Sequence, residues 1–159
     1  MNWDSWLLWG FVATLVLTTF SALTQGLGLT RMNIPYMLGT IFTPDRDKAR
    51  IYGFMVHVAA GWIFSLIYVL VFESLGRAGW WRGILIGLVH SVVALTVVAN
   101  LLPGLHPRMA SEQQGPESQN LLEPPGFLAM HYGVRTPLSI VFSHAIFGAI
   151  LGAFYHLKH

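Results

Sequence analysis

Residues 51–72, IYGFMVHVAAGWIFSLIYVLVF, contain no Asp, Glu, Lys or Arg, and this run decides the class of fold. Crossing ~30 Å of hydrocarbon takes about 20 helical residues, and the run is long enough. Residues 6–23, 83–102 and 137–157 form three more uncharged runs of this kind. All nine Lys and Arg and all seven Asp and Glu lie outside the four runs, because a charge at the centre of a membrane helix costs ~2.5–3.5 kcal/mol. The sequence predicts an all-α polytopic membrane protein, with four transmembrane helices in a single membrane domain over residues 1–159.

The composition supports this class and excludes others. Hydrophobic residues make up 54% of the chain and charged residues 10%, against about 25% charged in soluble proteins. The net charge of +2 is too small to form a basic stripe for nucleic acid, so no nucleic-acid partner is expected. With no Cys, the chain has no disulfide, no thiolate nucleophile and no Cys-ligated metal site.

The two loops that follow the first and third runs differ in character. Residues 25–50 contain Pro35 and Pro44 among apolar residues, which predicts an interfacial or re-entrant segment. Residues 103–136 form a polar loop, and residues 111–125 within it are rich in Gln, Glu, Ser, Pro and Gly. This composition is typical of an extended excursion into water.

The two halves of the chain share a pattern. His57 is followed by Gly61 and Tyr68, and His144 is followed at the same spacings by Gly148 and Tyr155. Residues 10–14 can likewise be aligned with residues 87–91. A duplicated two-helix hairpin explains the pattern, with its pseudo-twofold axis along the membrane normal. The other interpretation is chance matching among common membrane residues.

Each run also carries small or polar residues about one helical turn apart. Helices in lipid gain little from burying Leu against Leu, so they associate where small residues permit close approach. We therefore expect these stripes to face the interior of the bundle. Their members are Gly10, Thr14, Thr18, Ser21 and Gln25; Gly53, His57, Gly61 and Ser65; Gly83, Gly87, His90, Ser91 and Ala94; and His144, Gly148 and Gly152.

Three histidines, His57, His90 and His144, lie within the uncharged runs. Ionisable groups at that depth generally face a bundle interior or a cavity and raise a functional hypothesis. By helical rise, His57 and His144 lie at matched depth, ~10 Å below the face that carries the long loops. His106 and His131 lie in the polar loop on that same side, so these imidazoles are expected to converge from one side.

Three interpretations of the histidines remain open. The first is a haem b with His57 and His144 as axial ligands, since imidazole is a usual haem ligand. The second is a copper- or zinc-type ion, whose ligands would be His57, His144, His131 and His90. In the third, each His is hydrogen-bonded between helices, and the candidate partners are Tyr68, Tyr155, Ser91 and Thr14.

Other catalytic signatures are missing. No carboxylate lies within a run, and the chain has no H-E-x-x-H, G-x-S-x-G or P-loop motif. Ser143 and His144 are adjacent, but neighbouring side chains on a helix point apart, so they are not expected to form a nucleophile and base pair. We therefore do not expect an enzyme without a bound cofactor.

Residues 28–39, GLTRMNIPYMLG, resemble the GLxxM(D/N)IPxMLG element of a family of small bacterial membrane proteins with no assigned activity. Members share a His early in the second span, a Gly-Leu-x-His in the third and a Gly-His-x-x-x-Gly pattern in the fourth. The corresponding segments here are residues 57, 87–90 and 143–148, with Ser143 in place of the Gly before His144. The resemblance covers nearly the whole chain and implies a four-helix protein of the bacterial inner membrane.

The expected function is that of a non-enzymatic membrane protein, a structural or accessory subunit of a larger bacterial membrane complex. Its expected partners are the lipid bilayer and other membrane subunits or further copies of the chain. One alternative is a haem- or metal-binding protein for electron transfer or metal handling that uses the intramembrane histidines. A second alternative is a small transporter.

The loop that follows the first span is predicted to be cytoplasmic. Six of the nine Lys and Arg fall on the side of the two long loops, and positive loops face the cytoplasm. Those six are Arg31, Arg46, Lys48, Arg50, Arg108 and Arg135. A reporter fused after His159 should therefore be active in the periplasm, and cytoplasmic activity of the same fusion would reverse the assigned topology.

Overall fold

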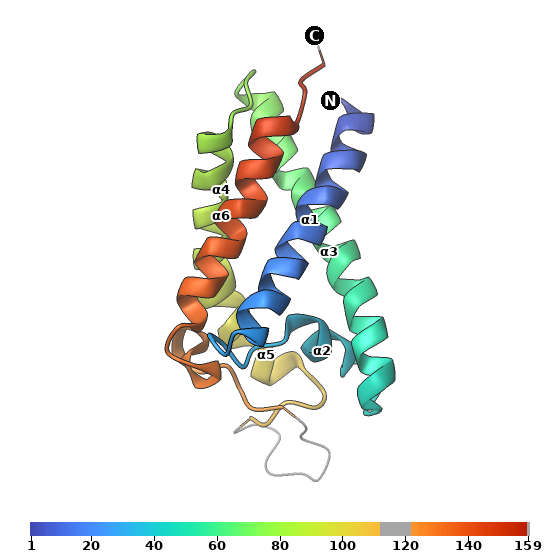
Figure 1. The fold of residues 1–159 in the computed structure, drawn as a ribbon, viewed down its shortest axis with the longest axis vertical. Helices are drawn as coiled ribbons and strands as arrows, with labels where there is room; N and C mark the ends of the chain where they lie inside the picture. Colours follow the sequence, from blue (N-terminus) through green and yellow to red (C-terminus); the bar gives the residue numbers. More distant parts are fainter. Residues whose placement is uncertain (112–121, 159) are drawn as a thin grey trace.

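The computed structural model describes residues 1–111 and 122–158, and its regular elements are all helices apart from one isolated bridge between Met109 and Leu122. Four helical spans in this part of the chain are long and apolar enough to cross a membrane, which confirms the predicted fold class. They form an upright bundle with both termini at one end (Figure 1). In chain order the elements are α1 (Trp3–Gly26), α2 (Ile34–Gly39), α3 (Arg46–Ser74), α4 (Trp80–Val93), a π-helical turn (Ala94–Val98), α5 (Ala99–Leu105), a 3₁₀ segment (Phe127–Tyr132) and α6 (Thr136–Phe154).

The helices differ in length from the uncharged runs that predicted them. Helix α3 begins at Arg46 because the Asp45 side chain caps it, accepting hydrogen bonds from the N–H groups of Asp47 and Lys48. Helix α6 instead ends at Phe154, earlier than expected, because Tyr155 is extended. Absence of charge marks the part of a helix in hydrocarbon, whereas caps decide where its hydrogen bonding begins and ends.

A π-helical turn joins α4 to α5 within the third span. The buried residues of this span recur every fourth position, and a regular α-helix would rotate such a stripe steadily out of the interface. One wider turn, closed by i→i+5 hydrogen bonds, offsets part of that drift. The buried set is Gly83, Gly87, Ser91, Leu95 and Ala99.

Helices α4 and α6 lie side by side and meet over glycine (Figure 1). A Cβ added at Gly83 or Gly148 would overlap the backbone carbonyl of the other residue, and Gly152 faces Gly79 in the same way. Gly87 lies against the backbone of His144. The expectation that these small residues face the interior is therefore confirmed for this pair of helices.

Helices α1 and α3 pack through a similar seam made of slightly larger side chains. Gly61 lies against Thr14, and Gly10 lies against Ser65 and Trp62. The seams of the two hairpins advance in steps of four on both helices. Their paired positions are 10 with 65, 14 with 61 and 18 with 57 in one hairpin, and 79 with 152, 83 with 148 and 87 with 144 in the other.

These contacts set the register between the halves. If His57 of α3 corresponds to His144 of α6, then the residues packed against them correspond as well, so Thr18 of α1 corresponds to Gly87 of α4. The sequence alignment instead matches Gly87 with Gly10, which lies about two helical turns from Thr18. The duplicated hairpin therefore stays a prediction, and the two first helices fit it only in the register set by the contacts.

The loop-bearing end of the bundle is closed by short elements packed across the helices. The expected interfacial segment contains α2, and Gly53 of α3 lies against the backbone of Pro35. His106 is buried, and its Nε2 lies 2.9 Å from the carbonyl oxygen of Met37, so it fixes the polar loop to α2. Most of the predicted polar excursion, residues 112–121, lies outside the described residues.

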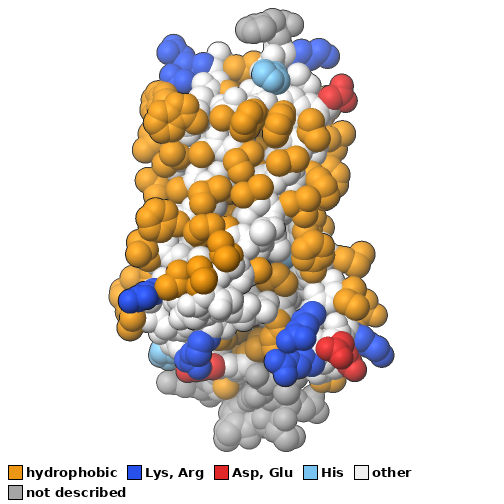
Figure 2. Space-filling model, in the orientation of Figure 1, with side chains coloured by type: hydrophobic (Ala, Val, Ile, Leu, Met, Phe, Trp, Pro, Cys, Tyr) orange, Lys and Arg blue, Asp and Glu red, His pale blue; other side chains and the backbone are white. Residues whose placement is uncertain are grey.

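The opposite end is held by contacts between the two termini and α3. The Tyr155 hydroxyl donates to Glu73 Oε1 at 2.5 Å, and the amino group of Met1 lies 3.6 Å from the same oxygen. The backbone N–H of Asn2 donates to the Tyr155 hydroxyl at 2.9 Å. On the face seen in Figure 2, hydrophobic side chains predominate between the two ends, while Lys and Arg lie toward the ends. This is the surface of a multi-pass membrane protein.

The glycine seam predicts a position-specific cost of adding volume to α6. Gly148→Leu should destabilise the bundle by about 2 kcal/mol or more, since its side chain would collide with the backbone of α4. Ala153→Leu adds volume on an exposed face of the same helix and is the matched control, expected to be nearly neutral. Thermal unfolding in detergent measures both, and equal losses would contradict the seam.

Candidate functional site: the intramembrane histidines

The three histidines of the spans come from three different helices, His57 from α3, His90 from α4 and His144 from α6. All three are half-buried. The rings of His90 and His144 are in direct contact, edge to face, with their centroids 4.6 Å apart. The structure therefore brings the rings of His90 and His144 together, while His57 contacts α1 through Thr18.

The tautomer of His57 follows from its contact with α1. Thr18 Oγ1 donates its single hydrogen to the carbonyl oxygen of Thr14 at 2.8 Å, which leaves only lone pairs for a second partner. His57 Nδ1 lies 3.1 Å from Thr18 Oγ1, so Nδ1 carries the hydrogen and donates it to this hydroxyl oxygen. His57 Nε2 therefore carries a lone pair, and it has no hydrogen-bond partner among the described residues.

His144 reaches the same tautomer through its own helix. Its Nδ1 lies 2.8 Å from the carbonyl oxygen of Ile140, which can only accept, so Nδ1 carries the hydrogen. Ser143 Oγ lies 3.4 Å from the same nitrogen, but it donates to the Ile140 oxygen at 2.8 Å. Both groups are donors to one carbonyl, so His144 does not act as a base toward Ser143.

His90 is held by aromatic neighbours and a phenol. Its Nδ1 lies 3.0 Å from the Tyr68 hydroxyl, and its ring packs against Phe64 with centroids 5.2 Å apart. Tyr68 was one of four partners considered for the histidines, and it serves His90. The other three candidates bond elsewhere: Tyr155 to Glu73, Ser91 to Leu88 and Thr14 to Gly10.

These contacts connect all four spans in sequence. Thr18 and His57 join α1 to α3, Tyr68 and His90 join α3 to α4, and the ring contact between His90 and His144 joins α4 to α6. An interhelical hydrogen bond in a membrane protein contributes about 0.6 kcal/mol on average. The histidines are therefore part of the packing, whatever else they do.

The two loop histidines lie apart from this group. His131 is exposed, and its Nδ1 lies 2.9 Å from the Pro124 carbonyl oxygen. Beside it, burial raises the pKa of Tyr132 to about 12, so the phenol stays protonated and donates to the backbone oxygen of Glu123. His106 is hydrogen-bonded to the Met37 carbonyl oxygen of α2. The expectation that the two loop histidines converge with the histidines of the spans is therefore wrong.

The predicted haem and metal ligands can be compared with this geometry. His57 and His144 each offer an Nε2 lone pair with Nδ1–H fixed by an oxygen, which is the usual arrangement of a metal-binding imidazole. His90 and His144 touch, so no porphyrin fits between those two rings. Within residues 1–111 and 122–158, no three or more His, Cys, Asp or Glu side chains are arranged to hold a metal ion.

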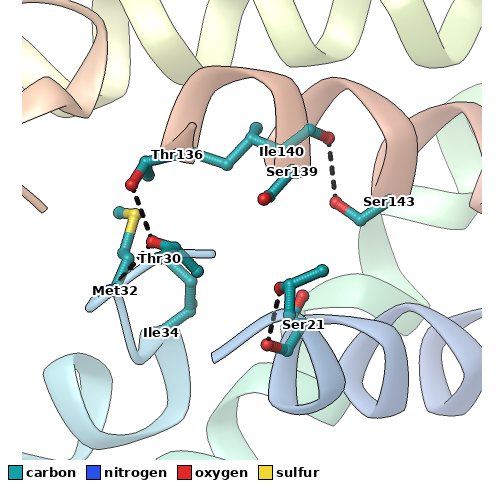
Figure 3. A pocket seen from close by; sticks show the side chains of 9 residues that line it. Ser21, Thr30, Met32, Ile34, Thr136, Ser139, Ile140 and Ser143 are labelled. Carbon is teal, nitrogen blue, oxygen red and sulfur yellow. Dashed lines mark hydrogen bonds between the residues drawn. The ribbon is translucent and has the colours of Figure 1, made fainter. Parts of the chain in front are cut away.

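Two cavities lie near the loop end, and residues 57, 90 and 144 line neither. The smaller, about 20 Å³, is surrounded by hydroxyls of α1, α6 and the segment before α2 (Figure 3). Ser21 and Ser143 donate to carbonyls of their own helices, so their lone pairs remain for a water molecule. The cavity was not predicted from the sequence. The only signal for it there is the recurrence of Ser and Thr at helical spacing at the end of α1 and the start of α6.

No protein-family model matches the chain, and neither a curated protein nor a solved structure is detectably similar to it.

The contact between Tyr68 and His90 predicts a measurable coupling. In a double-mutant cycle of Tyr68→Phe and His90→Ala, the coupling free energy of unfolding should be about 0.6 kcal/mol, typical of an intramembrane hydrogen bond. Tyr68→Phe combined with Thr18→Val, at a separate hydrogen bond, should be additive and serves as the control. Additivity in both cycles would show that the first contact contributes nothing.

Proposed function

We propose that this chain is a non-enzymatic, structural or accessory subunit of a larger complex in a bacterial inner membrane. The observation that carries the proposal is that three separate contacts of the span histidines join neighbouring helices: His57 with Thr18, His90 with Tyr68, and His90 with His144. Side chains used in this way specify a rigid bundle, which is what a scaffolding subunit requires.

Two further side chains among the described residues support the same function. Ser143 donates a hydrogen bond to the Ile140 carbonyl oxygen, and the Glu73 carboxylate is engaged by Tyr155 and the Met1 amino group. Catalysis needs a nucleophile or base within reach of a substrate and free to exchange a proton. Neither of these two groups is free in that sense.

An outer face of the third span offers a place for a partner subunit. Thr96 and Asn100 lie one turn apart on the exposed side of this span, beside the π-helical turn. Within the helix, Thr96 Oγ1 donates to the Val92 carbonyl oxygen, and Asn100 Nδ2 uses one of its two N–H groups to donate to the Thr96 carbonyl oxygen. Oxygen lone pairs of the two side chains remain for donors on a neighbouring helix, and π-helical turns are frequent at functional sites.

The proposal predicts a stable assembly that depends on this face. The chain extracted from its native membrane in mild detergent should migrate on a native gel together with a different membrane protein in fixed ratio. Asn100→Leu with Thr96→Val should reduce that fraction severalfold, whereas Leu85→Val, an exposed apolar change on α4, should not. Migration of the chain only by itself or with its own copies would contradict the accessory role.

A second function is favoured by a specific observation, the free Nε2 lone pairs of His57 and His144. It is the binding of a haem or a metal ion by these two histidines, for electron transfer or metal handling. The same preparation discriminates the two functions by its absorption spectrum and its metal content. A Soret band lost in His57→Ala and in His144→Ala would identify haem, and a bound metal without that band would identify an ion.

A further inference from the structure

A groove of about 340 Å³ opens where α1, the segment entering α2 and the first turns of α3 meet. Its volume is in the range of small-ligand sites. Gln25 lies in the last turn of α1 and Arg50 near the start of α3, so the groove lies at the membrane boundary on the loop side. The contacts among the histidines do not involve Gln25 or Arg50.

The polar wall of the groove presents unused donors. The side-chain oxygen of Gln25 accepts from Asn33 at 3.0 Å, so the two N–H groups of the Gln25 amide are left without a partner among the described residues. Among the described residues Arg50 forms an ion pair with Asp47 alone. The two side chains are 3.8 Å apart, beyond hydrogen-bond distance, and the Asp47 side chain is 91% exposed. An amide and a guanidinium with free N–H groups suit an oxyanion.

Apolar side chains continue the groove from its polar end toward the spans, and they form its apolar wall. Ala22 lies one turn from Gln25 along α1, and Phe54 lies one turn from Arg50 along α3. Phe54 also belongs to the exposed hydrophobic face of α3. A free phosphate would leave these apolar side chains uncovered, whereas an acyl chain would cover them. The occupant that satisfies both parts of the lining is an amphiphile with an anionic head.

The charges around the groove favour the same ligand. Three cations at the start of α3, Arg46, Lys48 and Arg50, outnumber the two carboxylates there, Asp45 and Asp47. Basic residues at a membrane boundary attract anionic headgroups by about 1 kcal/mol each. We propose that the groove binds an anionic phospholipid, with Arg50 and Gln25 donating to its phosphate and Phe54 in contact with an acyl chain.

The test compares retention of phosphatidylglycerol and phosphatidylcholine by the full chain in detergent, measured by native mass spectrometry. The wild-type protein should retain phosphatidylglycerol preferentially, and Arg50→Gln should lower that preference about fivefold. Arg46→Gln removes an exposed cation that does not line the groove, so it should lower the preference less than Arg50→Gln does. Thermal unfolding identifies variants that fail to fold.

A second variant keeps the charge and fills the apolar wall. Ala22 is exposed and lines the groove, so Ala22→Phe should fold and also lose phosphatidylglycerol. An unchanged preference in Arg50→Gln, or an equal loss in Arg46→Gln, would overturn the proposal in favour of diffuse surface charge. If glycerol phosphate competes as well as the lipid does, the groove is a site for a free anion and the lipid assignment is wrong.

Discussion

The close contact of α4 with α6 over Gly83, Gly87, Gly148 and Gly152 is the interaction on which the rest of the structure depends. Lipid tails are as apolar as Leu, so burying hydrophobic side chains does not hold two helices together in a membrane. Backbones that touch over glycine gain van der Waals contact that lipid cannot replace. Because Gly87 lies against the backbone of His144, this seam also brings the ring of His144 to that of His90.

The lack of hydrogen-bond partners in lipid explains which ring nitrogen of His57 and of His144 carries the hydrogen. Hydroxyls within a helix donate to carbonyls one turn earlier because lipid offers them no other partner. Thr18 is therefore an acceptor toward α3, which fixes the hydrogen of His57 on Nδ1, and Ile140 fixes that of His144 in the same position. The Nδ1–H of His57 joins α3 to α1, whereas that of His144 bonds within α6. In both residues Nε2 has no hydrogen-bond partner among the described residues, and the ligand binding proposed above would use these two atoms.

Much of the fold could be predicted from the sequence, and less of the site. The absence of charge located all four spans, and the spacing of small residues correctly indicated that Gly83 and Gly148 face inward. The interpretation of the histidines as interhelical bonding groups matches the contacts of His57 and His90, whereas the hydrogen bond of His144 lies within α6. Of the four partners proposed for them, only Tyr68 is used. The hydroxyl that lies opposite a given His depends on how two helices are rotated about their axes. The spacing of residues along one helix does not determine this rotation.

The sequence by itself determined that four segments cross the membrane and that small residues line their contacts. Both follow from local quantities, the transfer free energy of each side chain and its position on a helical turn. Only the tertiary structure decided that His90 meets His144, that His106 bonds α2, and that Gln25 and Arg50 line one groove. These residues are far apart in the chain, and shifts of a few ångströms in how the helices and loops pack decide whether their side chains meet.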